Sequence, residues 1–326
     1  MGVLDNGEWK PDATRDEYDH DSFDSRVRAA TDATFPAEAD RYHLYISRAC
    51  PWAHRAALTR RLLGLDGVVS MDVVDPVRRD AGWEFTPARD GCTADSVHGA
   101  ERLYEVFQTA DPEYTGPVTV PVLVDRETGT IVHEESADIS RMLATEFTEF
   151  QSADRDLYPE SLRGEIDDAI DDVHAGVNTG VYDAGFADSQ AEYEAAVEDL
   201  FTAMERWDDR LADQRYAVGD QLTLADVFLF PTLYRFDAVY HTHFKCNVRP
   251  LVDFDHLWDY ARDIYQTGDA ESTTVAATCN MDHAKAHYYR SHTDINPTGF
   301  VPVGPEADWT ATHGRAALAA DSDSSS

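Results

Sequence analysis

The order of apolar patterns in the first half of this 326-residue chain restricts its fold more than any other feature. A strand pattern, a helix pattern and a second strand pattern follow one another at residues 42–47, 51–63 and 68–74. After an irregular stretch with one short helix pattern, two more strands and a helix are indicated at residues 118–124, 130–133 and 136–147. This spacing predicts a βαβ unit followed by a β-hairpin and a helix.

The second half of the chain carries helix patterns only, at residues 163–177, 190–213, 224–240 and 253–265. Thr223 and Asp226 match a capping box at the start of the third helix, in which each residue's side chain accepts from the other's backbone N–H. The βαβ-then-ββα order is that of the thioredoxin-like fold. We therefore predict an α/β plus all-α protein, with an N-terminal thioredoxin-like domain and a C-terminal helical domain.

Changes in composition divide the chain into four segments. Residues 1–34 form an acidic N-terminal extension, residues 35–148 the thioredoxin-like domain and residues 149–307 the all-helical domain. Residues 308–326 end in Asp-Ser-Asp-Ser-Ser-Ser, which predicts a disordered acidic and serine-rich tail.

The chain is strongly negative, because it has 62 acidic and only 27 basic residues, which gives a formal net charge of −35. Such a chain repels itself unless salt screens its charges, so we interpret it as a cytoplasmic protein of a halophile. Nucleic acid is excluded as an expected partner by the same charge. The sequence contains no stretch resembling a membrane span or an export signal, so no membrane partner is expected.

Cys50 lies where the first strand pattern ends and the first helix pattern begins. A thiol at a helix N-terminus meets unpaired backbone N–H groups, which favour the thiolate, so Cys50 is a candidate nucleophile. Ala53 stands where a C-x-x-C motif would have its resolving cysteine, which excludes a dithiol cycle within this motif. The chain has three other cysteines, Cys92, Cys246 and Cys279. Four cysteines are too few for a disulfide scaffold, and this number is consistent with a protein of a reducing compartment.

Five segments resemble one family closely. They are residues 35–55 around Cys50, residues 119–136, and the motifs N-T-G-V-Y-D-A-G-F-A (178–187), H-F-K-C-N (243–247) and H-Y-Y-R-S-H-T-D-I-N-P (287–297). In these segments the chain resembles the glutathionyl-hydroquinone reductases, the Xi class of glutathione transferases, and a halophilic archaeal member in particular. The resemblance implies a thiol-cofactor-binding first domain, a substrate-binding second domain and a homodimer.

The resemblance also implies the reaction. Cys50 matches the family nucleophile, whose thiolate attacks the sulfur of a glutathionyl-hydroquinone and is left in a mixed disulfide that a second thiol resolves. Val120 and Pro121 match the residues of the family that present backbone groups to the thiol peptide, Pro121 being the cis-proline. Glu135 and Ser136 match the pair that holds the γ-glutamyl end, although both could simply cap a helix.

Four aromatic residues complete the site that the family implies. Trp83 lies where the family has a tryptophan over the cofactor, although a tryptophan that merely closes the core is the alternative. Tyr182, Tyr240 and Tyr288 match tyrosines that line the quinone pocket, with Tyr289 as the neighbour of Tyr288 that could replace it. Their hydroxyls suit a developing ring oxyanion and their rings suit an aromatic substrate.

The identity of the thiol is open because Pro117 occupies a position where the family commonly has a basic residue. That cation helps to bind the thiol peptide. We therefore expect glutathione or γ-glutamylcysteine as co-substrate, and hypothesise a preference for the thiol that lacks the glycine carboxylate.

Other functions fit parts of the sequence. His241, His243 and Cys246, followed by His283, His287 and His292, make a histidine-rich metal-binding protein conceivable. No metal is expected, however, because Lys245 would repel a cation and the H-F-K-C-N motif belongs to the family match. Two further alternatives are an Omega-like thioltransferase or dehydroascorbate reductase, and a non-catalytic binding module.

Overall fold

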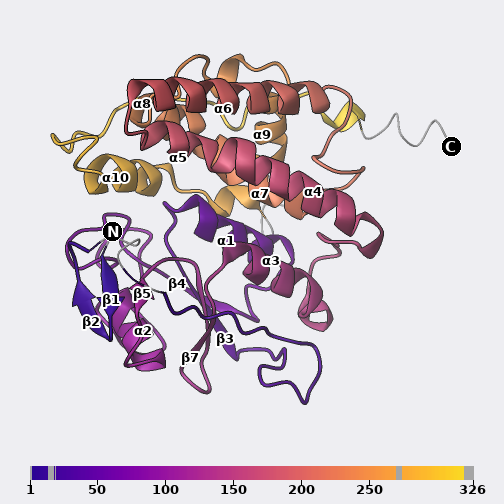
Figure 1. Ribbon diagram of the computed structural model, residues 1–326. Helices are drawn as coiled ribbons and strands as arrows, with labels where there is room; N and C mark the ends of the chain where they lie inside the picture. The colour runs from indigo at the N-terminus through magenta and orange to yellow at the C-terminus, as the bar shows by residue number, and fades with distance from the viewer. Residues whose placement is uncertain (1, 14–17, 19, 269–273, 319–326) are drawn as a thin grey trace. The chain divides into compact units, whose positions relative to one another are not determined.

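The chain divides into two compact units in a computed structural model that describes residues 2–13, 18, 20–268 and 274–318 (Figure 1). The first unit comprises residues 1–154 and 282–299, and the second residues 155–281 and 300–326. Residues 282–299 therefore group with the first unit, whereas the sequence analysis assigns them to the helical domain. Most of helix α10 (Met281–Ser291) belongs to this returning segment.

The first unit is built on a four-stranded sheet with the strand order β4-β3-β6-β7. Its strands are β3 (Tyr42–Ile46), β4 (Ser70–Val73), β6 (Val122–Asp125) and β7 (Thr130–His133). β3 and β4 are parallel and joined by helix α1 (Pro51–Leu62), whereas β6 and β7 form an antiparallel hairpin beside β3. The βαβ-then-ββα prediction is confirmed, with element ends within a few residues of those expected.

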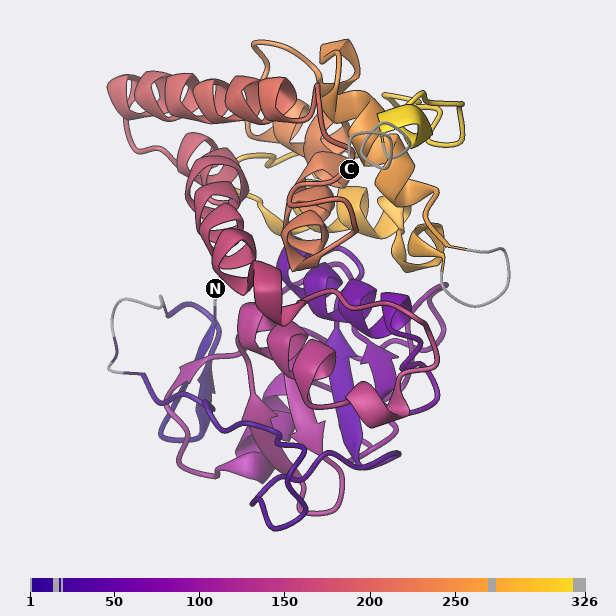
Figure 2. The ribbon, with the colours of Figure 1, turned by 90° about the vertical axis from the view of Figure 1, so that its right-hand side faces the viewer.

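Helices cover both faces of this sheet. Helices α1 and α3 (Ser136–Thr145) lie side by side on one face, and α2 (Leu103–Ala110) lies on the other (Figures 1 and 2). β3 is buried along its whole length because helices cover both faces of the sheet, and α1 buries residues around its whole circumference.

The N-terminal residues form a second, small sheet that the sequence analysis does not predict. β1 (Val3–Asp5) pairs with β2 (Glu8–Lys10) on one side and β5 (Gly116–Pro117) on the other. Asn6 and Gly7 connect β1 to β2 with φ angles of 48° and 73°. This is the Asn-Gly signature of a type I′ hairpin, so the turn was visible in the sequence.

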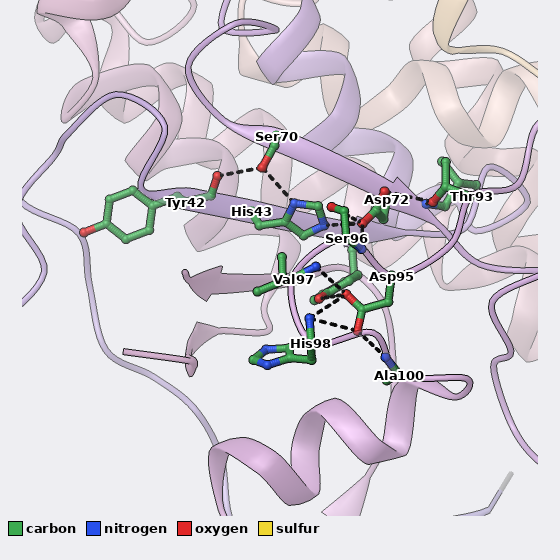
Figure 3. A network of polar contacts seen from close by, with 12 residues as sticks. Tyr42, His43, Ser70, Asp72, Thr93, Asp95, Ser96, Val97, His98 and Ala100 are labelled. Carbon is green, nitrogen blue, oxygen red and sulfur yellow. Dashed lines mark hydrogen bonds and ion pairs between the residues drawn. The ribbon is translucent and has the colours of Figure 1, made fainter. Parts of the chain in front are cut away.

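A partly buried polar network connects the irregular stretch to the edge of the main sheet (Figure 3). The Asp72 carboxylate accepts from the hydroxyls of Thr93 and Ser96, and Nε2 of His43 lies 3.1 Å from it. Nδ1 of His43 lies 2.8 Å from the Ser70 hydroxyl. Polar side chains thus contribute to holding the loop after β4 against β3 and β4.

Replacing Asp72 with asparagine should destabilise the protein by about 2 kcal/mol at pH 7. Burial alone would raise the pKa of Asp72, but hydrogen bonding from His43 and Ser96 outweighs it and lowers the pKa to about 2. A folded-state pKa below the unfolded value means that the stabilisation is present above about pH 4 and is lost as the pH falls toward 2.

Urea unfolding between pH 7 and pH 2.5, at one salt concentration, measures this difference. The gap between wild type and Asp72→Asn should narrow below pH 4. Asp80→Asn, at an exposed position, is the control and should change stability by less than about 0.5 kcal/mol. A gap that stays constant with pH would show that Asp72 stabilises the fold through packing alone.

The second unit contains no strand among its described residues. Its helices are α4 (Arg163–Val173), α5 (Gly180–Gly185), α6 (Gln190–Arg210), α7 (Leu224–Arg235), α8 (His241–His243) and α9 (Leu257–Tyr265). Two of the predicted helices end in π-helical turns, His174–Asn178 after α4 and Phe236–Tyr240 after α7. The prediction of an all-helical second domain agrees with this unit, and the family comparisons below establish the fold.

Asp226 is fully buried at the start of α7. The predicted capping box is confirmed, because Asp226 and Thr223 form it at this helix start. The Asp226 carboxylate accepts from the backbone N–H of Thr223 at 2.8 Å. It also accepts from the N–H of Ala217 at 2.7 Å and from the Tyr260 hydroxyl at 2.8 Å. One carboxylate therefore joins α7, α9 and the loop before α7.

The segment expected to be a disordered tail is anchored at its start. Arg315 is buried, and its guanidinium donates to the carbonyls of Leu211, Gln214 and Arg215. Residues 319–326 lie outside the described part of the chain. Among the described helices, none has the length and apolar character needed to cross a membrane.

Candidate active site

Cys50 caps helix α1, as the sequence predicts. Its Sγ accepts from the backbone N–H of Ala53 at 3.5 Å, and Pro51 is the first helical residue. The thiol is partly exposed, and α1 has no acidic residue in its first turn. An N-terminal helix position without a nearby carboxylate on the helix favours a negative charge on the sulfur.

Val120 and Pro121 lie opposite this cysteine. The peptide bond between them is cis, as the resemblance implies, and the Cys50 thiol donates to the Val120 carbonyl at a distance of 3.7 Å. The Val120 N–H donates to no acceptor among the described residues. A peptide ligand beside Cys50 could therefore pair with this N–H as an added strand does.

Helix α3 begins at Ser136, with Glu135 as its N-cap residue. Neither residue caps the helix through a side-chain hydrogen bond, although capping was the alternative role for both. Ser136 is buried and Glu135 is exposed. The helix start thus combines backbone N–H groups, a hydroxyl and a carboxylate, a set that can bind an amino acid head group.

Trp83 is buried in the irregular stretch, with 4% of its surface exposed. Its ring stacks on that of His287 at 5.2 Å, and the Arg78 guanidinium lies 5.6 Å from the ring centroid. His287 in turn contacts the backbone carbonyl of Pro76 through Nδ1 at 2.7 Å. This stack is not predicted from the sequence, in which His287 is only a conceivable metal ligand.

Helix α10 brings Tyr288 and Tyr289 into the first unit. Both are buried, with 1% and 4% exposed, and the Tyr288 ring contacts the rings of His287 and His292. Their burial therefore does not show which of the two tyrosines is the better candidate for lining the quinone pocket. Their neighbour His287 links them to Trp83, so α10 and the irregular stretch form one aromatic group in this unit.

Tyr182 and Tyr240 meet in the second unit, with ring centroids 5.9 Å apart. Both rings also contact Phe244, and Tyr182 stacks on the half-exposed Phe186. Tyr240 ends one π-helical turn, and Tyr182 follows the other, a feature that is frequent at functional sites. The family resemblance indicates the two tyrosines as site residues but neither phenylalanine.

Gly185 explains part of the motif that carries Tyr182. A Cβ atom at this position would lie 2.3 Å from the Phe244 ring, so only glycine lets that ring pack against α5. The Y-D-A-G-F sequence was therefore a signal for an aromatic cluster. Glycine beside aromatic residues at helical spacing indicates a close approach of a ring to the backbone.

The residues of the metal-binding alternative do not form one cluster in the described chain. His241, His243 and Cys246 belong to the second unit, whereas His283, His287 and His292 belong to the first. Burial, assisted by Lys245, lowers the pKa of His243 to about 4. Within the described residues, no group of three or more His, Cys, Asp or Glu side chains could hold a metal ion.

Comparisons with known proteins define the class of this fold and site. Residues 49–146 match the N-terminal domain of glutathione S-transferases, and residues 190–263 match the C-terminal domain. Among solved structures, a Xi-class transferase from Natrialba magadii superposes with a TM-score of 0.93 at 50% identity, covering 98% of this chain and 97% of that one. The chain therefore has the glutathione transferase fold.

Individual relatives narrow the class further. Glutathionyl-hydroquinone reductase YqjG of Escherichia coli is 46% identical over 86% of this chain and 84% of its own. Glutathionyl-hydroquinone reductase PcpF of Sphingobium chlorophenolicum is 43% identical over 94% and 96%. A glutathione-bound structure of the E. coli protein has a TM-score of 0.88 and 42% identity, covering 97% and 99%. This chain belongs to the glutathionyl-hydroquinone reductases, and it is an oxidoreductase of glutathione transferase type.

Proposed function

We propose that the protein removes a glutathionyl or γ-glutamylcysteinyl group from hydroquinone conjugates through a mixed disulfide on Cys50. One observation supports this most directly. Cys50 presents its sulfur at the start of α1, within contact of the Val120 carbonyl, so a thiol peptide that pairs with Val120 has its own sulfur beside the nucleophile.

The reaction proceeds in two displacements. The Cys50 thiolate attacks the sulfur of the thioether, an S–S bond forms, and the C–S electron pair stays on the ring carbon, which takes up a proton. A second thiol, as thiolate, then attacks the sulfur of the bound peptide. Its attack releases Cys50 as thiolate and yields the disulfide of the small thiol. The hydroquinone ring is thereby reduced, and the sulfur of the conjugate and that of one added thiol are oxidised to the disulfide.

The remaining residues divide into two sets. Val120, Pro121, Glu135, Ser136 and Trp83 bind the thiol peptide, with Glu135 pairing with its ammonium group and Ser136 with its carboxylate. Tyr182, Tyr240 and Tyr288 receive the aromatic ring and donate hydrogen bonds to its oxygens. No metal takes part, and the enzyme works as a cytoplasmic homodimer.

An assay of thiol-dependent reduction of a thioether-linked hydroquinone, run at molar salt, tests the proposed function. Release of free hydroquinone together with stoichiometric disulfide of the added thiol is expected. Faster reduction of dehydroascorbate than of the thioether would instead favour the Omega-like alternative. Metal analysis of untagged protein accompanies the assay, because bound zinc at one equivalent would contradict the metal-free mechanism.

The thiol preference is a separate prediction. Pro117 is buried and pairs with Val3 in the small sheet. Because proline has neither a charged side chain nor a backbone N–H, this position offers neither a charge nor an N–H to a ligand. We expect half-saturation at a roughly three- to tenfold lower concentration of γ-glutamylcysteine than of glutathione, because the glycine carboxylate finds no cation at this position.

Glutathione amide is the matched control for this titration, because it keeps the glycine but lacks the carboxylate charge. It should saturate the enzyme at concentrations close to those of γ-glutamylcysteine. Comparable half-saturation by glutathione and γ-glutamylcysteine would show that the loss of the basic residue has no consequence for thiol choice.

A further inference from the structure

The N-terminal hairpin, residues 3–10, has no part in the reaction described above, yet it contacts two segments that carry proposed thiol-binding residues. Its first strand, β1, pairs with β5, so that Val3 lies opposite Pro117 and Leu4 opposite Gly116. Val3 and Leu4 are fully buried. The hairpin is therefore packed into the first unit along the strand that leads to the cis peptide bond.

The turn of the hairpin holds the same part of the chain through three further hydrogen bonds. The Gly7 N–H donates to the Tyr114 carbonyl at 3.0 Å, and the Asn6 N–H donates to the Thr115 hydroxyl at 2.9 Å. The Gln108 side chain donates to the Gly7 carbonyl at 2.7 Å. Hydrogen bonds on both sides of the turn thus fix the start of β5 to the hairpin.

The second strand of the hairpin contacts the other segment through Trp9. The Trp9 indole N–H donates to the Asp80 carbonyl at 2.7 Å, and its ring stacks on that of Tyr104 in α2 with centroids 4.9 Å apart. A Cβ atom at Gly82 would lie 3.0 Å from the Trp9 ring, so the backbone there runs close to the ring. The next residue in the chain is Trp83.

The backbone of Trp83 is held by α2 as well. Its carbonyl accepts from the N–H of Leu103, the first residue of α2, at 2.9 Å. The small sheet lies beside this helix (Figure 1). The Trp9 ring therefore packs against both the helix and the segment that position Trp83, and a stacked aromatic pair with a hydrogen-bonded indole favours one arrangement of the three.

We propose that Trp9 is a positioning residue for the thiol peptide, because the hairpin joins the Trp83 segment (residues 80–83) to the strand that precedes Val120. The inference rests on the proposed binding roles of Trp83 and Val120. Two segments that are held together before the ligand arrives need not be ordered on binding, so the affinity for the ligand is higher. Among the described residues, the hydrogen bond and ring contact of Trp9 run to Asp80 and Tyr104, so we expect binding, and not the reactivity of Cys50, to depend on it.

Equilibrium binding of a non-reactive thioether tests this proposal. S-methylglutathione and S-methyl-γ-glutamylcysteine are titrated into the full-length protein by calorimetry in molar KCl. Trp9→Ala should raise the dissociation constant of the thioether that binds the wild type roughly five- to tenfold. The rate of Cys50 alkylation by iodoacetamide in the unliganded protein should stay within about twofold of the wild type, which a general distortion of the site would not allow.

Two further variants keep the test independent of a single substitution. Trp9→Phe keeps an aromatic ring against Tyr104 but loses the indole N–H, so its dissociation constant should lie between those of the wild type and Trp9→Ala. Tyr104→Leu removes the stacking partner from α2 and should weaken binding about threefold. Thermal melting verifies that each variant is folded.

Trp258→Ala is the matched control. Trp258 is also a partly exposed indole that packs on an aromatic ring, that of Trp309 at 4.9 Å, but it belongs to the second unit. Its loss should leave the dissociation constant unchanged. An equal rise in Trp258→Ala, or a parallel loss of Cys50 alkylation in Trp9→Ala, would show a general effect on the fold and overturn the proposal.

The outcome is separable from that of the proposed function. If neither thioether binds the wild type, the proposed thiol site fails, and the role of Trp9 fails with it. If the wild type binds a thioether and folded Trp9→Ala and Tyr104→Leu bind it equally well, the proposed function stands and the role of Trp9 is refuted.

Discussion

Replacing Cys50 with serine should abolish thiol-dependent reduction of a hydroquinone thioether, lowering kcat/KM by at least about a thousandfold. Serine is nearly isosteric, and its hydroxyl can still accept from the Ala53 N–H, so the fold should be kept. The hydroxyl is far less acidic than a thiol and cannot form a disulfide. The loss should therefore lie in kcat, while binding of the thiol peptide is largely retained.

Cys92→Ser is the control for this experiment. Cys92 is the other described thiol of the first unit, is also partly exposed, and contacts the Val74 carbonyl at 3.6 Å. Burial raises its pKa, which makes it a poor nucleophile, so its loss should leave activity within about twofold of the wild type. If Cys50→Ser bound the ligand and kept full activity, the mechanism would be contradicted. If the wild-type protein bound the ligand but did not catalyse the reaction, it would be a binding module.

Replacing Asp226 with alanine should lower the free energy of unfolding by about 4 kcal/mol. The carboxylate is fully buried and accepts from the N–H groups of Ala217 and Thr223 and from the Tyr260 hydroxyl. Alanine leaves these buried donors without an acceptor, and each unsatisfied donor costs about 1–3 kcal/mol. The loss also removes the side chain that joins α7 to α9.

Urea unfolding followed by circular dichroism measures the change, with Asp220→Ala as the matched control. Asp220 is an exposed acid in the loop before α7, and its loss should change stability by less than about 0.5 kcal/mol. Asp226→Asn, which keeps an acceptor oxygen, should fall between the two. Equal stabilities of Asp226→Ala and Asp220→Ala would mean that the buried hydrogen bonds contribute nothing net to the fold.

The main elements could be predicted because each depends on local rules. Strand β3 is a short apolar run, and α1 starts at a Cys-Pro pair suited to a helix N-terminus, so both were visible in the chain. The capping box of Thr223 and Asp226 was predicted in the same way. The Asn6-Gly7 hairpin is equally local, but the acidic composition of the N-terminal segment does not indicate it.

Other features could not be predicted because they join residues far apart in the sequence. The acceptor role of Asp226 toward Tyr260 depends on how α9 packs on α7. Likewise, the stacking of Trp83 on His287 brings the irregular stretch against α10, although α10 lies within residues 149–307, which the sequence assigns to the helical domain. The π-helical turns before Tyr182 and at Tyr240 each continue an α-helix, and the sequence pattern does not distinguish them from it.

The sequence by itself determined the family, the position of Cys50 at a helix start and the monothiol character of its motif, because these depend on residue identity and on local helix-start geometry. Only the tertiary structure decided which groups surround Cys50. The Val120 carbonyl, beside the cis Val120–Pro121 bond, reaches it from another part of the first unit. Long-range contacts set charge and exposure, and these are the properties that turn a cysteine at a helix start into a reactive thiolate.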